Sequence, residues 1–122
     1  METNKKIRPV LTNLSLNLSE NEAEYFQNKV LRPIIKLQSD LILAHLNAKL
    51  QGLKIQINEL NEKKKKEILK SIFSKDLAHK REVIGIIIGQ FELEEFQTYS
   101  EMSKEINKRI IQISLNRCLD LI

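Results

Sequence analysis

The segment that most constrains the fold is residues 83–91, which reads VIGIIIGQF. Its side chains are apolar on every side at helical spacing, and a helix without a polar face persists only where other elements cover it. Gly85 and Gly89 lie four residues apart on one face, a spacing that lets a neighbouring backbone approach closely. The run is too short to cross a bilayer. We therefore expect this segment to form the central core helix, with Gly85, Gly89 and Phe91 packed inside.

The rest of the composition predicts an all-α protein. Of the 122 residues only three are Gly and two are Pro, so the turns that an all-β fold needs are missing, while good helix formers are abundant. A chain of this length can bury one core without disulfides or metals. We predict a single-domain bundle of about five helices in residues 19–122. Residues 1–18 form an extended N-terminal arm in this prediction.

Within the arm, Leu14, Leu16 and Leu18 alternate with polar residues, a pattern typical of an extended segment with one buried edge. We favour docking on the chain's own bundle, because a fully solvated tail gains nothing from its leucines. Docking on a partner and disorder are the alternatives. No continuous apolar run follows the basic residues near the N-terminus, so we expect no secretory signal.

A long first helix is predicted from Ser19, which has capping-box spacing to Glu22. An apolar stripe then runs at three- and four-residue spacing. It comprises Ala23, Phe26, Val30, Ile34, Leu37, Leu41, Ala44 and Ala48. Phe26 is thereby expected in the core. Pro33 interrupts the helix and should kink it, because proline removes a backbone hydrogen bond; a stop at Leu31 with a restart at Pro33 is the alternative.

Gly52 is expected to end this helix as a left-handed cap. Residues 53–60 read LKIQINEL, and this alternation predicts an extended surface segment that can pair with the arm. Asn61 reads as the N-cap of the next helix, and Asp76 as a break or cap before the central helix. Glu92 then begins a short helix in which Leu93 and Phe96 should face inward.

The last helix, starting near Ser100 or Ser103, carries two apolar stripes where a peripheral helix needs one. The first contains Met102, Ile106, Ile110 and Ile113, and the second contains Ile111, Leu115, Cys118 and Ile122. The first helix likewise has apolar residues off its main face, namely Ile35, Ile42, Leu46 and Leu50. Either the last helix is sandwiched inside the fold or one stripe contacts a second copy. We favour a homodimer.

The sequence contains no catalytic or metal-binding pattern. A single His79–Glu82 pair cannot supply the several ligands that a metal needs, so we expect His79 at a solvated helix start and His45 as a hydrogen-bonded boundary residue. The lone Cys118 excludes an internal disulfide, which is typical of a cytoplasmic protein. Neither a nucleophile elbow nor a phosphate-binding glycine loop is present. We therefore predict no catalytic residues, no metal and no cofactor.

A net charge of +4 permits an anionic partner. Arg32 and Lys36 lie one helical turn apart beside Pro33, and Lys75, Lys80 and Arg81 lie at the start of the central helix. Of these basic residues, Arg32, Lys36, Lys75 and Arg81 are the candidate anion site; salt bridges to neighbouring aspartates are the competing interpretation. Nucleic acid is disfavoured, because a helix-turn-helix made from residues 61–91 would present isoleucines to the base edges.

Residues 22–41 and 75–96 resemble a family of short bacterial helical proteins that are often labelled glyoxalase or uncharacterised. The resemblance runs from Glu22 to Arg117, and its most specific parts include the runs Leu31-Arg32-Pro33-Ile34 and Gly89-Gln90-Phe91. The family implies no established activity. Proteins similar to glyoxalase I bind a divalent metal through His, Gln and Glu side chains on separate strands. This chain has neither those strands nor those ligands, so we interpret the enzymatic label as a misnomer.

The resulting prediction is a non-enzymatic, cytoplasmic helical protein that acts through protein contacts as a homodimer, with no membrane partner. The alternative is a module that binds a small anion or nucleic acid through the basic cluster near Pro33.

Overall fold

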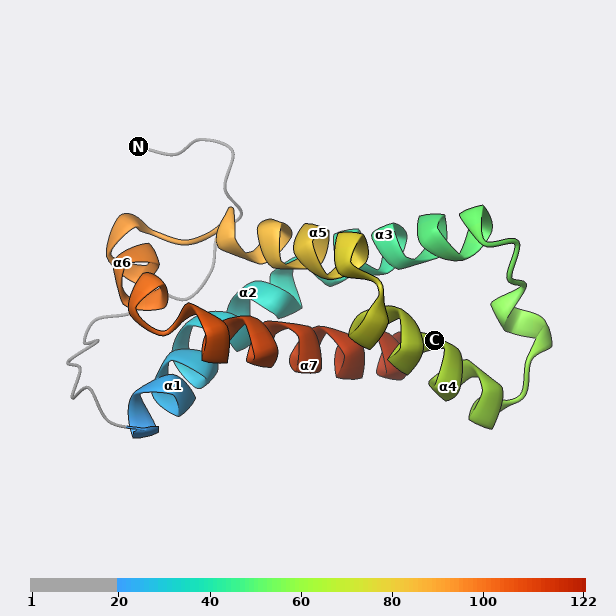
Figure 1. Ribbon diagram of the computed structural model, residues 1–122, viewed down its shortest axis with the longest axis horizontal. Coiled ribbons are helices and arrows are strands. Elements are labelled where there is room, and N and C mark those ends of the chain that lie inside the picture. The colour runs from blue at the N-terminus through green and yellow to red at the C-terminus, as the bar shows by residue number, and fades with distance from the viewer. Residues whose placement is uncertain (1–19) are drawn as a thin grey trace.

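The structure is a computed structural model that describes residues 20–122 (Figure 1). These residues form α-helices joined by short turns and contain no strand, so the predicted all-α class is confirmed. The predicted arm, residues 1–18, lies outside the described residues. Ser19 of the predicted capping box lies outside them as well.

The N-terminal half of the described chain forms one bent helical rod. It comprises α1 (Glu20–Phe26), a π-helical turn η1 (Gln27–Leu31), α2 (Arg32–Leu37) and α3 (Ser39–Gly52). After a short 3-10 helix, η2 (Ile57–Glu59), four helices follow: α4 (Glu62–Lys75), α5 (Leu77–Ile88), α6 (Leu93–Glu101) and α7 (Ser103–Leu121). One rod and four helices match the predicted single-domain bundle of about five helices.

The central element of this bundle is α7. It contacts α2, α3, α4, α5, α6 and η1, and Figure 1 shows it crossing the molecule beneath α5, with α4 beside its second half. Both of its apolar stripes are used inside the fold, since Ile106 and Ile110 of one and Leu115 and Cys118 of the other are buried. Of the two interpretations offered for α7, the structure therefore supports the sandwiched helix.

The prediction that residues 83–91 form a helix covered on every side is wrong. Val83, Ile87 and Phe91 are buried, and Phe91 packs edge-on against Phe26 with ring centroids 5.6 Å apart. Gly85 and Gly89, however, are exposed. A Cβ on Gly85 would meet nothing within 4 Å, and one on Gly89 would meet only carbonyls of its own helix. Neither glycine permits a close helix approach, so neither belongs to the packed core.

Pro33 lies in the first turn of α2 and is accommodated without ending the rod. The preceding turn is π-helical, with the Arg32 amide donating to the Gln27 carbonyl five residues back, and such a turn absorbs the missing proline donor locally. The interruption lies instead at Gln38, whose backbone departs from helical geometry (φ −97°, ψ 12°). There Ser39 Oγ donates to the Ile35 carbonyl at 2.9 Å, a back-bond that commonly bends helices.

This break changes which side of the rod faces the core. Beyond it, Leu41 is 48% exposed and Ala44 and Ala48 are exposed, so the predicted continuous stripe ends near Leu37. The apolar residues predicted to lie off the main face form the core side of the rod at and beyond this break. They are Ile42, Leu46 and Leu50, together with Ile35 of α2.

Two predictions about the following segment are also corrected. Gly52 is the last residue of α3 and has no positive φ; the left-handed residue is Lys54, at φ 59°. Residues 53–60 are not extended, because they form turns and η2, with the Ile55 amide donating to the Leu50 carbonyl at 2.9 Å. The predicted N-cap at Asn61 is confirmed by its side chain, which accepts from the Lys64 amide at 2.8 Å.

In α6 the inward-facing residues differ from the prediction. Leu93 is 75% exposed and Phe96 is 44% exposed, whereas Glu95 and Tyr99 are buried. Glu95 takes part in a capping box at the start of α6, in which its carboxylate turns back to accept from the Glu92 amide at 2.7 Å.

Candidate functional site

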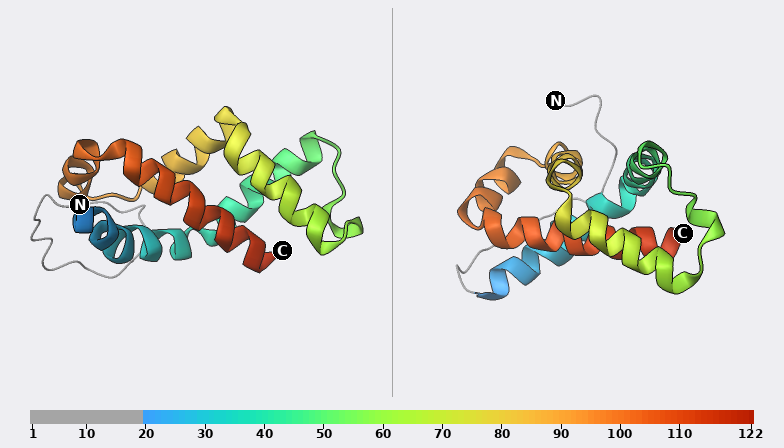
Figure 2. Two further views of the ribbon diagram at one scale, coloured as in Figure 1. Left: turned by 60° about the horizontal axis from the view of Figure 1, so that its bottom comes forward. Right: turned by 45° about the vertical axis from the view of Figure 1, so that its right-hand side comes forward.

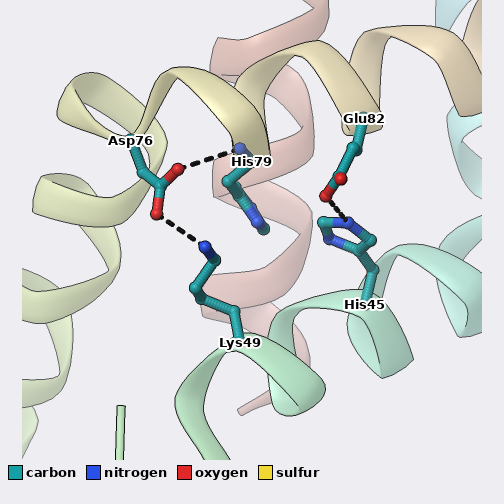
Figure 3. Close-up of polar contacts among 5 residues, drawn as sticks. All are labelled: His45, Lys49, Asp76, His79 and Glu82. Carbon is teal, nitrogen blue, oxygen red and sulfur yellow. Dashed lines mark hydrogen bonds and ion pairs between the residues drawn. The ribbon is translucent and has the colours of Figure 1, made fainter. Parts of the chain in front are cut away.

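α5 carries polar side chains on two sides, and on the side facing α3 its His79 lies beside His45 of α3 (Figure 3). His79 is fully buried, which contradicts its predicted place at a solvated helix start. Its ring lies 4.6 Å from that of Phe73 and 4.8 Å from that of His45. Neither of its ring nitrogens has a hydrogen-bond partner among the described residues.

Two charged pairs flank these rings and connect α3 to α5. His45 Nε2 donates to Glu82 Oε1 at 2.6 Å, and Lys49 Nζ donates to Asp76 Oδ2 at 2.8 Å (Figure 3). Asp76 is also the N-cap of α5, where its other oxygen accepts from the His79 amide at 3.0 Å. The prediction of His45 as a hydrogen-bonded boundary residue is confirmed. We call these five residues the histidine cluster.

The electrostatics of the histidine cluster favour neutral imidazole at its centre. Burial, reinforced by the neighbouring His45, lowers the pKa of His79 from 6.5 to about 4. The hydrogen bond from Lys49 holds the pKa of Asp76 below its usual range. Within residues 20–122, no group of three or more His, Cys, Asp and Glu side chains is arranged to hold a metal ion. Through its two charged pairs the cluster joins α3 to α5.

The other polar side of α5 borders a groove between α4, α5 and α7, with a volume of about 370 Å³. Four lysines line it: Lys70 of α4, Lys80 of α5, and Lys104 and Lys108 of α7. The remaining lining is an apolar set, Phe73, Ile84, Ile111 and Leu115, and an uncharged polar set, Ser74, Asn107 and Gln112. We call this feature the lysine groove. Its size lies at the lower end of the range of small-molecule sites.

The charge of the lysine groove is uncompensated by its own lining. Of the described residues that border it, none carries a carboxylate. Lys80 Nζ donates weakly to the Ser74 carbonyl at 3.5 Å. The ion pairs recorded between described residues involve Lys49, Lys65, Arg109 and His45 but none of the four groove lysines. Four lysines thus border an apolar floor, and such a local excess of positive charge attracts anions.

A second groove, of about 440 Å³, lies between α3, the 53–58 segment and the end of α7. Its polar lining consists of amides, Asn47, Gln51, Gln56 and Asn58, beside six aliphatic residues. Because no charged side chain lines it among the described residues, it lacks the electrostatic selectivity of the lysine groove.

The four residues predicted as an anion site do not line the lysine groove, although Lys80, from the same basic group at the start of the central helix, does. Arg32 Nε donates to Asn28 Oδ1 at 3.1 Å, Lys36 is exposed on α2, Lys75 ends α4 and Arg81 is exposed on α5. An anion site at these four residues stays a prediction. The helical spacing of Lys104 and Lys108 was the available signal for the lysine groove, but sequence alone could not place Lys70 and Lys80 opposite them.

Cys118 offers no nucleophile. Its side chain is buried in α7, and this burial raises the pKa of the thiol to about 11. A thiol with such a pKa is almost entirely protonated near neutral pH, and only the thiolate attacks electrophiles.

Comparisons with known proteins identify no matching family model, no matching curated protein and no matching solved structure. The resemblance to the glyoxalase-labelled helical family therefore stays a prediction. Across residues 20–122, no helix has both the length and the hydropathy required to traverse a bilayer.

Proposed function

We propose that this protein is a non-enzymatic binding protein whose ligand is a small anion with an apolar part, held in the lysine groove. The observation that supports the proposal is the set of four lysines around an apolar floor, with no carboxylate among the described lining residues. The ligand class matches the alternative function predicted from the sequence, although the residues differ. The lone buried Cys118 is consistent with a cytoplasmic setting, which is part of the proposal.

Both parts of the ligand contribute to its binding. Attraction between an anion and exposed ammonium groups is long-ranged but screened by salt, so by itself it gives weak, salt-sensitive binding. Burial of an apolar group against Phe73, Ile84 and Leu115 adds roughly 25 cal/mol for each Å² removed from water. We therefore expect an anion with an apolar chain to bind more tightly than inorganic phosphate or acetate.

The direct test is calorimetric titration of the full chain with decanoate, comparing wild type with the double variant Lys104→Met and Lys108→Met. Methionine keeps the apolar stem and removes the charge. We expect the groove variant to bind about tenfold more weakly, the effect of about 1.4 kcal/mol, and to show a shallower dependence on salt.

The matched control is the double variant Lys63→Met and Lys66→Met, which removes the same charge from α4 outside the lysine groove. It should change the affinity by less than about twofold if local charge matters more than net charge. Equal losses in the two double variants, or no binding of decanoate by wild type, would contradict the proposal.

A homodimer is the second candidate function. The exposed side chains of Leu93 and Phe96 on α6 now support it, because the stripes of α7 are used within the chain. Light scattering of the wild-type protein at high concentration should give twice the mass of one chain. The double variant Leu93→Ser and Phe96→Ser should give the mass of a single chain. A single-chain mass for wild type would remove this candidate.

A further inference from the structure

The exposed face of α6 is apolar and has acidic residues beside it. Leu93 is 75% exposed and Phe96 is 44% exposed, and residues three apart on a helix share one face. Glu94 and Glu101 are exposed as well, about two turns apart on the same flank of this face. The ion pairs recorded between described residues include neither of these carboxylates. We call this surface the α6 face.

The lysine groove has the complementary composition. Its floor is apolar and four lysines border it, with no carboxylate among the described lining residues. Opposite charges on two surfaces speed their encounter and fix their relative orientation, while burial of the apolar side chains contributes affinity. The α6 face therefore has the two properties that we propose for the ligand of this groove, negative charge and an apolar part.

The opposite side of α6 fixes the helix at the border of its own groove. Glu95 and Tyr99 are buried, and Tyr99 Oη donates to Asn107 Oδ1 at 2.8 Å. Asn107 lines the lysine groove. Because Leu93 and Phe96 lie on the exposed side of α6, away from these contacts, they are available to a second copy of the chain.

The α6 face and the lysine groove are neighbours on the molecule. Figures 1 and 2 show α6 beside the first turns of α7, which carry Lys104 and Lys108 of the groove. A closed two-fold dimer repeats each contact, so that every copy supplies one α6 face and one groove. Proximity of the two surfaces within one chain favours the formation of both contacts around a single axis.

We infer that, in the homodimer, the α6 face of each copy binds in the lysine groove of the other copy. Leu93 and Phe96 then cover the apolar floor, and Glu94 and Glu101 lie beside the lysines. The inference rests on the homodimer, the second candidate function, and identifies its interface. Because the same groove is the site proposed for the small anion, the anion and the second copy compete for it.

The test reverses the charge of each surface in turn and measures association by light scattering over a range of concentrations. The α6 variant is Glu94→Lys with Glu101→Lys, and the groove variant is Lys104→Glu with Lys108→Glu. Each variant alone opposes like charges, so we expect its dissociation constant to rise about tenfold or more. An equimolar mixture should associate more tightly than either variant alone, because the native α6 face of the groove variant meets the native groove of the α6 variant.

The matched control is Lys63→Glu with Lys66→Glu, which changes the net charge equally on α4 but outside the lysine groove. It should change the dissociation constant by less than about twofold if local charge matters more than net charge. Circular dichroism of every variant checks that the helical fold is retained. Saturation of wild type with decanoate should release single chains, and a dimer that persists with decanoate bound would contradict the inference.

The remaining outcomes separate this inference from the proposals of the preceding section. A single-chain mass for wild type would remove the homodimer and this interface together, while binding of decanoate would still test the small-anion site. If wild type is a dimer and the groove variant keeps its dissociation constant, the homodimer stands and the inference is overturned. Failure of the mixture to associate more tightly than either variant alone would overturn it as well.

Discussion

The two polar sides of α5 differ in whether their charged side chains form ion pairs with other described residues. Toward α3, Asp76 pairs with Lys49 and Glu82 pairs with His45, at 2.8 and 2.6 Å. Toward α4 and α7, Lys80 faces a groove with three further lysines and no carboxylate among the described lining residues. Paired charges are satisfied within the chain and serve to hold helices together. The groove lysines, by contrast, have no carboxylate partner among the described lining residues, and water solvates those that are exposed.

Burial differs between the two sides as well. The histidine cluster has a fully buried imidazole at its centre, whereas Lys70, Lys104 and Lys108 of the lysine groove are exposed. Substitutions in the cluster should therefore change stability, and substitutions in the groove should change binding.

Acid should destabilise the protein through His79. Its pKa is about 4 in the folded chain and 6.5 ordinarily, so between these values the unfolded chain binds the proton more readily. The stability from neutral His79 is complete above about pH 6.5 and is lost as the pH falls to 4, by about 3 kcal/mol at 1.36 kcal/mol per pH unit. Urea unfolding at a series of pH values measures it.

The control is His79→Met, which fills the site with a flexible apolar side chain. Carboxylates also titrate in this pH range, so the relevant quantity is the difference between wild type and variant. That difference should shrink steadily toward neutral pH. A difference that does not depend on pH would show that protonation of His79 does not contribute to the loss of stability in acid.

Removal of one lysine from each side of α5 compares the two sides directly. Lys49→Met breaks the pair with Asp76 and should lower Tm by a few degrees. Lys104→Met should leave Tm unchanged or raise it slightly, because it relieves repulsion from Lys108. Thermal unfolding followed by circular dichroism measures both variants under one buffer condition. Similar losses in both would mean that the groove lysines also have a structural role.

Gly85 lies on a third, exposed side of α5, and it belongs neither to the histidine cluster nor to the lysine groove. Because nothing occupies the space around its missing Cβ, Gly85→Ala should stabilise the protein by about 1 kcal/mol through helix propensity. Gly89→Ala is the contrasting variant, since its Cβ would lie 3.3 Å from the Gly85 carbonyl oxygen. Urea unfolding distinguishes the two, and a destabilising Gly85→Ala would restore the original idea of a packed glycine pair.

The smallest effect is expected from Glu82→Gln. The glutamine oxygen can still accept from His45 Nε2, and the Glu82 side chain is 60% exposed, so the loss should stay below about 0.5 kcal/mol. Chemical denaturation at neutral pH is sufficient to measure it. A larger loss would mean that the negative charge itself matters to the histidine cluster.

Part of this outcome was predictable from local sequence. The all-α class, the single domain and the caps at Asn61 and Asp76 follow from composition and short-range spacing, because a helix and its first turn depend on neighbours within four residues. The prediction that His45 lies at the boundary of the core and forms a hydrogen bond was also correct. The anion site was predicted at residues that do not line the lysine groove, because charge on a helix does not reveal which helix it will face.

The sequence by itself determined where most helices form and that no familiar catalytic pattern is present. Tertiary structure decided the rest. The back-bond of Ser39 and the break at Gln38 rotate α3 and exchange its buried and exposed stripes, and α7 rather than residues 83–91 takes the centre. The physical reason is that an apolar stripe can be buried against any apolar surface of complementary shape. Which surface it meets depends on how all the helices pack together.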